Sequence, residues 1–89
     1  MNERTTKRLP WQKECILFNQ SGLIKTETVD ISLKGLGVKT ESALPVNFIN
    51  GCKLTALVSG VEFTETEIIW TNKKSNYTTG IGLKFQLGK

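Results

Sequence analysis

The stretch LIKTETVDISLKGLGVKT, residues 23–40, carries the pattern on which the fold prediction rests. In residues 23–31 the side chains alternate between two faces, and the threonines suit a strand that is half exposed. Ser32-Leu33-Lys34-Gly35 is then typical of a turn, because serine and glycine favour the backbone conformations that turns need. Residues 36–40 complete the pattern, so the stretch predicts two strands joined by a turn.

The same succession of short strands and turns extends in both directions along the chain. Further strands are expected at residues 13–18, 53–58, 61–70 and 77–87, with turns at residues 19–22 and at Ser59-Gly60. Residues 42–51 are expected to form a connection or a short irregular strand, and residues 71–76 a polar loop. No segment has a sustained helical period. Six or seven short strands therefore predict an all-β fold, either a small antiparallel barrel or a sandwich.

Length and composition limit the class of protein. The chain has 89 residues, enough for one domain, and its 38% hydrophobic and 22% charged content is typical of soluble globular proteins. It has neither an apolar run of the roughly 20 residues that a membrane helix needs nor a signal-peptide pattern, so we expect a cytoplasmic protein without membrane contact. The net charge of +4 favours an anionic partner, and both arginines, Arg4 and Arg8, lie near the N-terminus.

The sequence lacks the residue types on which many catalytic and metal sites depend. There is no histidine to act as the base for a serine or cysteine nucleophile, so we predict that the protein is not an enzyme. Cys15 and Cys52 are far apart, which favours free thiols over a zinc site, although a disulfide between them stays open. Glu62, Glu65 and Glu67 are expected to form a solvated strand face. We expect no metal and no cofactor.

Two short groups of residues are candidates for a binding site. Arg4 and Arg8 could hold an anion together, because arginine donates paired hydrogen bonds to phosphates and guanine edges; a basic terminal tail is the alternative. In Asp30-x-Ser32-x-x-Gly35, alternation would place Asp30 and Ser32 on one face to bind a base, and Gly35 would let a ligand approach the backbone. The alternative for this second group is an ordinary turn capped by Asp30 and Ser32.

The order and spacing of these groups resemble a known family. Arg4-x-x-x-Arg8 followed by Asp30-x-Ser32-x-x-Gly35 resembles the paired signature of PilZ domains, the bacterial receptors for cyclic diguanylate. Ile68-Ile69-Trp70 and Gly80-Ile81-Gly82-Leu83-Lys84-Phe85 are similar to the last two strands of that family. The resemblance covers nearly the whole chain. It implies a small six- or seven-stranded antiparallel β-barrel at residues 11–89, preceded by a flexible N-terminal ligand-binding arm at residues 1–10.

The resemblance also implies a mode of binding and a function. The arm would wrap over cyclic diguanylate on the outer surface of the barrel, with Arg4 and Arg8 at the guanine edges and phosphates. Asp30 and Ser32 would reach a guanine, and Gly35 would give room at the turn. The expected function is that of a bacterial, cytoplasmic sensor that orders its arm on binding and signals to an unidentified protein effector.

Two other functions stay open on the sequence. One is a PilZ fold that serves as a protein-interaction module without significant ligand binding. The other is a small β-barrel that binds single-stranded nucleic acid, for which basic charge and aromatic rings are typical. Nucleic acid is the less favoured partner, because most of the rings are expected in the core and no basic stripe follows a strand.

Overall fold

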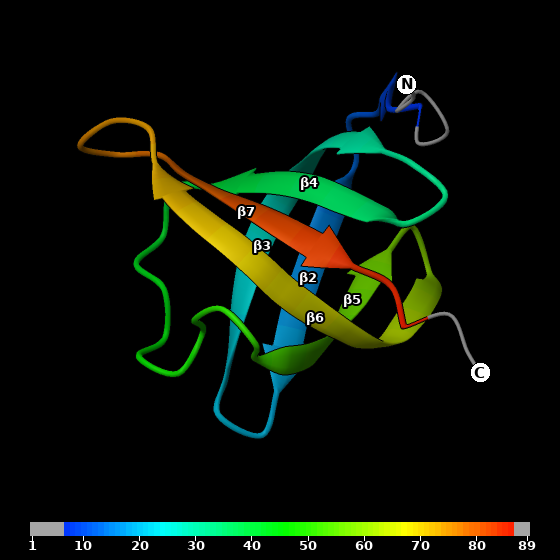
Figure 1. The fold of residues 1–89 in the computed structure, drawn as a ribbon. Coiled ribbons are helices and arrows are strands. Elements are labelled where there is room, and N and C mark those ends of the chain that lie inside the picture. Colours follow the sequence, from blue (N-terminus) through cyan, green and yellow to red (C-terminus); the bar gives the residue numbers. More distant parts are fainter. Residues whose placement is uncertain (1–6, 87–89) are drawn as a thin grey trace.

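The structure, a computed structural model, describes residues 7–86, and this part of the chain is built from seven strands without a helix. The strands are β1 (Leu9–Pro10), β2 (Glu14–Asn19), β3 (Gly22–Ile31), β4 (Gly35–Thr40), β5 (Lys53–Val58), β6 (Val61–Lys73) and β7 (Thr79–Lys84). They form a closed barrel, which confirms the predicted all-β antiparallel fold (Figure 1). Residues 7–86 contain no helix long and apolar enough to cross a membrane.

The ring of the barrel has the strand order β3-β2-β5-β6-β7-β4, and the pairing of β4 with β3 closes it. All of these pairings are antiparallel. β1 lies outside the ring and pairs with the end of β3, where Pro10 is opposite Asp30. The described end of the predicted arm, residues 7–10, is thereby held beside the arrowhead of β3 (Figure 1).

The interior is filled by the inward-facing side chains of the ring strands. The largest fully buried side chains on these strands are Leu17, Leu36, Ile68, Ile81 and Leu83, and Phe48 joins them from outside the strands. Phe48 comes from the connection between β4 and β5, in which its N–H donates to the carbonyl of Pro45 (3.0 Å). Residues 42–51 therefore form a loop without a strand, and its one fully buried aromatic ring fastens it to the core.

The two cysteines are free thiols, which answers the question of a disulfide. Burial raises the pKa of the Cys15 thiol, and a hydrogen bond with Thr26 partly offsets that rise. Cys52 is half-buried, and the side-chain amide of Asn19 donates to its Sγ (3.3 Å). Cys15 therefore acts as a small core side chain rather than as a reactive group.

The hairpin between β6 and β7 is longer than the sequence indicated. The predicted loop at residues 71–76 is wrong for residues 71–73, which belong to β6 and pair with residues 79–81 of β7. The side chains of residues 71–73 are exposed on both faces of the strand, and the hairpin projects from the barrel (Figure 1). The loop is confined to residues 74–78, where the N–H of Lys74 donates to the carbonyl of Thr78 (2.8 Å).

A β-bulge at Val29 changes the direction in which the end of β3 faces. Thr28 is buried and pairs with Val38, whereas Asp30 pairs with Gly37, so Val29 is an extra residue in β3. Strict alternation would put the Asp30 side chain on the buried face with Thr28. The extra residue instead brings the Asp30 carboxylate to the outer face of the barrel.

A second bulge, at Ile69, has the same effect on β6. Ile68 is buried and pairs with Leu83, and the next pair is Trp70 with Gly82, so Ile69 has no partner on β7. Without the bulge, the Trp70 ring would point into the core with Ile68. With it, Trp70 lies on the outer face and keeps 42% of its surface exposed. Phe48 is buried and Trp11, Phe63 and Phe85 pack against the core, as expected for most of the rings, whereas Trp70 and Tyr77 (78% exposed) lie outside it.

Candidate ligand-binding site

The two bulges place Asp30 and Trp70 at opposite ends of one row of residues across the outer face. Asp30 on β3 is opposite Gly37 on β4, Gly37 is opposite Gly82 on β7, and Gly82 is opposite Trp70 on β6. Neighbouring strands are about 4.8 Å apart, so the row is about 14 Å long when it is followed along the curved sheet. The row thus offers a carboxylate at one end, an indole at the other and a floor without side chains between them.

The two glycines of the floor are needed for the side chains that lie over them. A Cβ atom at Gly37 would come within 2.7 Å of Asp30 Oδ1, and one at Gly82 would collide with the indole of Trp70. Any larger residue at these positions would push the carboxylate or the ring away from the floor. Gly37 and Gly82 therefore position Asp30 and Trp70.

Arg8 approaches the same end of the row from the segment just before β1. Its Nε and Nη2 atoms donate to one carboxylate oxygen, Asp30 Oδ1, at 3.0 and 2.8 Å. Within residues 7–86, Oδ2 of Asp30 receives no hydrogen bond, and the other N–H groups of Arg8 donate to no acceptor. The side chains of Arg8 and Asp30 are 45% and 30% exposed, and a pair this accessible to water stabilises a fold by about 1 kcal/mol at most. Contacts to a ligand can therefore replace the Arg8–Asp30 ion pair at a small cost in free energy.

A cavity of about 320 Å³ opens above this row. Arg8, Asp30, Gly37, Trp70 and Gly82 all line it, together with the apolar side chains of neighbouring strand residues. One side of the Trp70 ring covers Gly82 and reaches Gly80, while the rest of the ring is accessible. An aromatic ring that packs on the backbone with one face and is accessible on the other can stack against a planar base.

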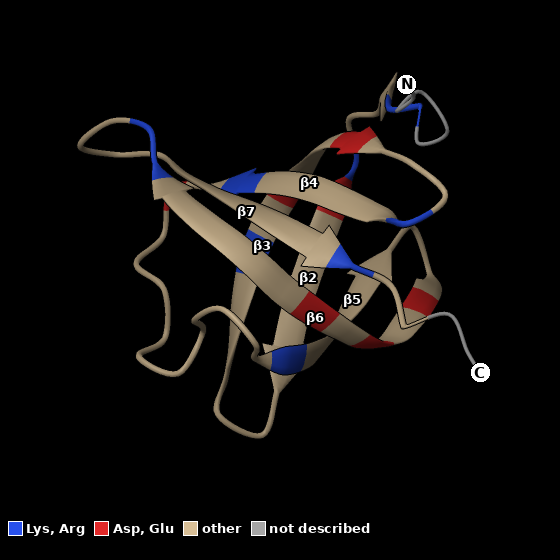
Figure 2. Ribbon diagram, in the orientation of Figure 1, with Lys and Arg blue, Asp and Glu red and all other residues tan. Residues whose placement is uncertain are grey.

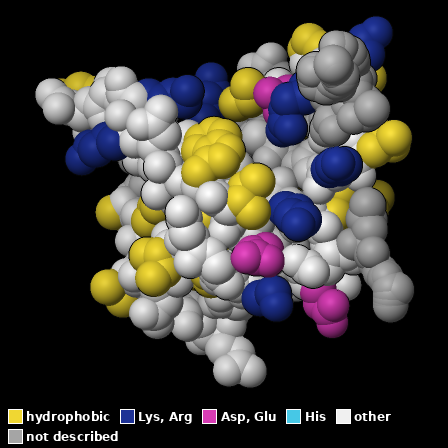
Figure 3. All heavy atoms as spheres, in the orientation of Figure 1, with side chains coloured by type: hydrophobic (Ala, Val, Ile, Leu, Met, Phe, Trp, Pro, Cys, Tyr) yellow, Lys and Arg dark blue, Asp and Glu magenta, His cyan; other side chains and the backbone are white. Residues whose placement is uncertain are grey.

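The electrostatic character of this face is basic. Lys and Arg positions occur near both ends of β4, on the β6–β7 hairpin and at the end of β7, with acidic positions at the end of β3 and along β6 (Figure 2). In the space-filling view, basic side chains lie on two sides of a central hydrophobic group (Figure 3). This distribution favours an anionic ligand that also has flat apolar surfaces.

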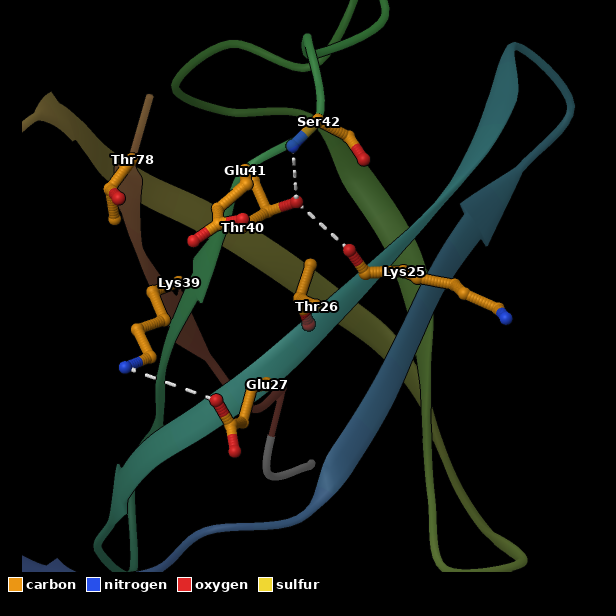
Figure 4. Close-up of a pocket in the computed structure, with 8 residues that line it drawn as sticks. All are labelled: Lys25, Thr26, Glu27, Lys39, Thr40, Glu41, Ser42 and Thr78. Carbon is orange, nitrogen blue, oxygen red and sulfur yellow. Dashed lines mark hydrogen bonds and ion pairs between the residues drawn. The ribbon is translucent and has the colours of Figure 1, made fainter. Parts of the chain in front are cut away.

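A larger hollow, of about 430 Å³, lies where β3 and β4 separate, and its chemistry is different (Figure 4). Lys39 is 3.9 Å from Glu27, so its charge is offset. The hydroxyl of Thr40 donates to the carbonyl of Lys25 (2.9 Å) and accepts from the N–H of Ser42 (3.1 Å). This hollow is lined by neither an arginine nor an aromatic ring. The smaller cavity is therefore the candidate ligand-binding site.

The sequence as a whole was compared with known proteins. The family model described as PilZ domain matches residues 2–88, which is nearly the whole chain. The chain belongs to the PilZ domain family. No curated protein matches it. PilZ domains are binding modules rather than enzymes, so the cavity beside Asp30 is interpreted as a binding site of this PilZ domain.

The structure brings together only part of the predicted PilZ site. Arg8 and Asp30 are in direct contact, whereas Arg4 lies outside the described residues. Ser32 is 8% exposed and does not line the cavity; its Oγ accepts a hydrogen bond from the N–H of Lys34 (3.2 Å). Ser32 comes directly after Ile31, the last residue of β3, so its role as a ligand contact beside Asp30 stays a prediction. Ser32 caps the β3–β4 turn.

Gly35 also has a structural function in this PilZ domain. A Cβ atom at Gly35 would collide with the backbone carbonyl oxygen of Leu83, on the neighbouring strand β7. The carbonyl of Gly35 itself accepts from the N–H of Ser32 (2.9 Å), which closes the turn. Gly35 does not line the cavity. Close contact of β4 with β7, rather than room for a ligand, is what the structure requires of this glycine.

Sequence reasoning missed most of the residues that line the cavity, among them Gly37, Trp70, Lys74 and Gly82. Trp70 and Gly82 had been placed only in the closing strands, and Lys74 in a polar loop. The signal that could have found them is the pair of alternating glycines on each strand, Gly35-x-Gly37 and Gly80-x-Gly82. Two strands that each leave one face without side chains predict a flat surface that something else covers.

Proposed function

We propose that this PilZ domain binds cyclic diguanylate on the outer face of its barrel, over the Asp30–Gly37–Gly82–Trp70 row. The observation that carries the proposal is the combination of the Arg8–Asp30 pair and the accessible Trp70 ring across a glycine floor. The ligand has two guanines and two phosphodiester charges, and the row offers a matching group for each kind of surface. Membership of the PilZ family supports the choice of this ligand over other anions.

Arg8 and Asp30 together suit one guanine. The open Oδ2 of Asp30 can accept hydrogen bonds from the guanine N1–H and N2–H groups, which are donors. The unused N–H groups of Arg8 can donate to guanine O6 and N7 or to a phosphate oxygen. An arginine–guanine pair contributes about 1–3 kcal/mol of discrimination against another base. This end of the row is therefore assigned to base selection.

Trp70 suits the flat surface of a base. Stacking of a base on an aromatic side chain contributes about 1–3 kcal/mol and does not depend on the identity of the base. The back of the Trp70 ring is held by Gly82, so little motion has to be lost on binding. We assign Trp70 to affinity and the Arg8–Asp30 pair to specificity.

Signalling would follow from the position of Arg8 at the base of the N-terminal arm. In this proposal the ligand holds Arg8, and with it residues 1–10, over the barrel and so presents a new surface to a protein effector. Because cyclic diguanylate is a bacterial cytoplasmic messenger, the same proposal places the protein in the bacterial cytoplasm. The protein is then an adaptor that converts ligand concentration into a contact.

The proposal is tested by isothermal titration calorimetry of the purified chain with cyclic diguanylate. We expect binding of the cyclic dinucleotide, and at least tenfold weaker binding of guanosine monophosphate, which cannot occupy both ends of the row. A short single-stranded oligonucleotide serves as the second comparison. No heat with cyclic diguanylate at tens of micromolar protein would reject the proposal, and tighter binding of the oligonucleotide would favour the nucleic-acid alternative.

Stacking on Trp70 predicts a fluorescence change that calorimetry does not report. The chain has a second tryptophan, Trp11, which is half-buried and outside the cavity, so the measurement uses a Trp11→Phe variant. Cyclic diguanylate is expected to quench the remaining Trp70 emission with the same dissociation constant as in calorimetry. Binding without any change in Trp70 emission would show that the base does not stack on this ring.

A further inference from the structure

Lys74 is a third charged group at the cavity, and it comes from an element that the PilZ signature does not include. It lines the cavity together with Arg8 and Asp30, but it belongs to the hairpin loop between β6 and β7. Arg8 and Lys74 therefore reach the cavity from two different parts of the chain. Lys74 can therefore contact a ligand at a different point from Arg8.

The backbone of this hairpin loop is well held. The N–H of Lys74 donates to the carbonyl of Thr78 (2.8 Å), and the N–H of Ser75 donates to the same oxygen (3.2 Å). The Ser75 hydroxyl oxygen accepts from the N–H groups of Tyr77 (3.2 Å) and Thr78 (3.1 Å). The backbone of Lys74 is therefore held in place by the hydrogen bonds of this loop.

The stem of the Lys74 side chain is also placed. It lies over Gly80, where a Cβ atom would be 2.7 Å from Lys74 Cε and 3.5 Å from Cζ3 of Trp70. The alkyl stem thus fills the space beside the indole, and the ammonium group can extend from it into the cavity. Within residues 7–86, no carboxylate forms an ion pair with Lys74, in contrast to Arg8 and Lys39.

Charge balance shows what the ammonium group can do. Arg8 is offset by Asp30, so without Lys74 the described groups of the cavity have no net charge to meet two phosphates. We propose that Lys74 is a second phosphate anchor, acting from the β6–β7 hairpin, and that it makes the site selective for a ligand with two phosphodiester groups. This inference rests on the proposed binding of cyclic diguanylate and deepens it. Arg8 holds one phosphodiester, and Lys74 holds the other at the Trp70 end of the row.

The test compares Lys74→Met with Lys73→Met by titration calorimetry. Methionine keeps the stem over Gly80 and removes only the charge, and Lys73 is a neighbouring exposed lysine that does not line the cavity. We expect Lys74→Met to weaken cyclic diguanylate binding roughly five- to tenfold, and Lys73→Met to change it less than twofold. Lys74→Arg keeps the charge and is expected to stay within about threefold of the original chain.

A second probe separates selectivity from general attraction. Guanylyl-guanosine has both guanines but one phosphodiester, which Arg8 binds more strongly than Lys74 because arginine donates two hydrogen bonds. Lys74→Met should therefore weaken guanylyl-guanosine binding less than twofold. Equal losses for both probes, equal losses in Lys73→Met, or no loss in Lys74→Met would each overturn the inference while the proposed function stands. Absence of cyclic diguanylate binding in the original chain would overturn both.

Discussion

Replacing Asp30 with alanine is expected to weaken cyclic diguanylate binding at least tenfold. The change removes the only carboxylate among the described residues that line the cavity, and with it the proposed acceptor for the guanine N1–H and N2–H donors. Hydrogen bonds to a charged group contribute about 1.5–3 kcal/mol, which corresponds to a loss of about tenfold or more. Arg8 keeps its charge and can still hold a phosphate, so the loss should fall on base selection.

The matched control for this prediction is Glu27→Ala. Glu27 is a carboxylate on the same strand, is paired with a lysine as Asp30 is paired with an arginine, and does not line the cavity. The Glu27→Ala substitution therefore removes the same charge from β3 and leaves the Asp30–Gly37–Gly82–Trp70 row unchanged. Titrations with cyclic diguanylate and cyclic diadenylate should show that only Asp30→Ala lowers the preference for guanine. Unchanged affinity in Asp30→Ala would contradict the assignment of guanine recognition to this carboxylate.

Replacing Gly35 with alanine is expected to have the largest effect on stability. The new Cβ atom would meet the backbone carbonyl of Leu83, which cannot turn aside as a side chain can. β4 and β7 would have to separate, and the buried contacts of Leu36 and Leu83 would loosen with them. Overpacking of this kind costs about 3 kcal/mol, which lowers the melting temperature of a domain of this size by about 12–24 °C.

Gly80→Ala is the control for the effect of adding a methyl group to this surface. Its Cβ would meet the end of the flexible Lys74 side chain, which can swing away, so we expect a loss of less than about 1 kcal/mol. Thermal unfolding followed by circular dichroism compares the two variants. Similar melting temperatures for Gly35→Ala and Gly80→Ala would show that close strand contact is not what requires Gly35.

Much of the fold was readable from the sequence because it depends on local patterns. The alternation in residues 23–31, the Ser59-Gly60 turn and the absence of a helical period were sufficient to predict an all-β fold, either a barrel or a sandwich, and the PilZ resemblance then favoured the barrel. Ser59 and Gly60 do adopt positive φ angles of 52° and 83°, as a tight two-residue turn requires. Arg8 and Asp30 were predicted as partners at one site, and the structure places them in contact.

The rest of the site depends on which strands become neighbours and on where alternation is interrupted. A bulge leaves no clear trace in a single sequence, so the outward direction of Asp30 and Trp70 had to come from the structure. The part played by Gly37 follows only once β4 is known to lie between β3 and β7. Ser32 and Gly35 fit the PilZ signature equally well as ligand contacts or as turn and packing residues. Only their contacts in the structure favour the second interpretation.

The Arg8–Asp30 pair has a consequence for how binding responds to ionic strength. Salt weakens the attraction between Arg8 and a phosphate, but it also weakens the attraction between Arg8 and Asp30 in the unbound protein. The two effects oppose each other in the binding equilibrium, so Arg8 should contribute little to its salt dependence. Lys74 has no such counterion among the described residues, so its contact with a phosphate should account for most of the salt dependence of binding. Binding affinity should therefore depend little on ionic strength through contacts at the Arg8 end of the site, and more strongly through contacts at the Lys74 end.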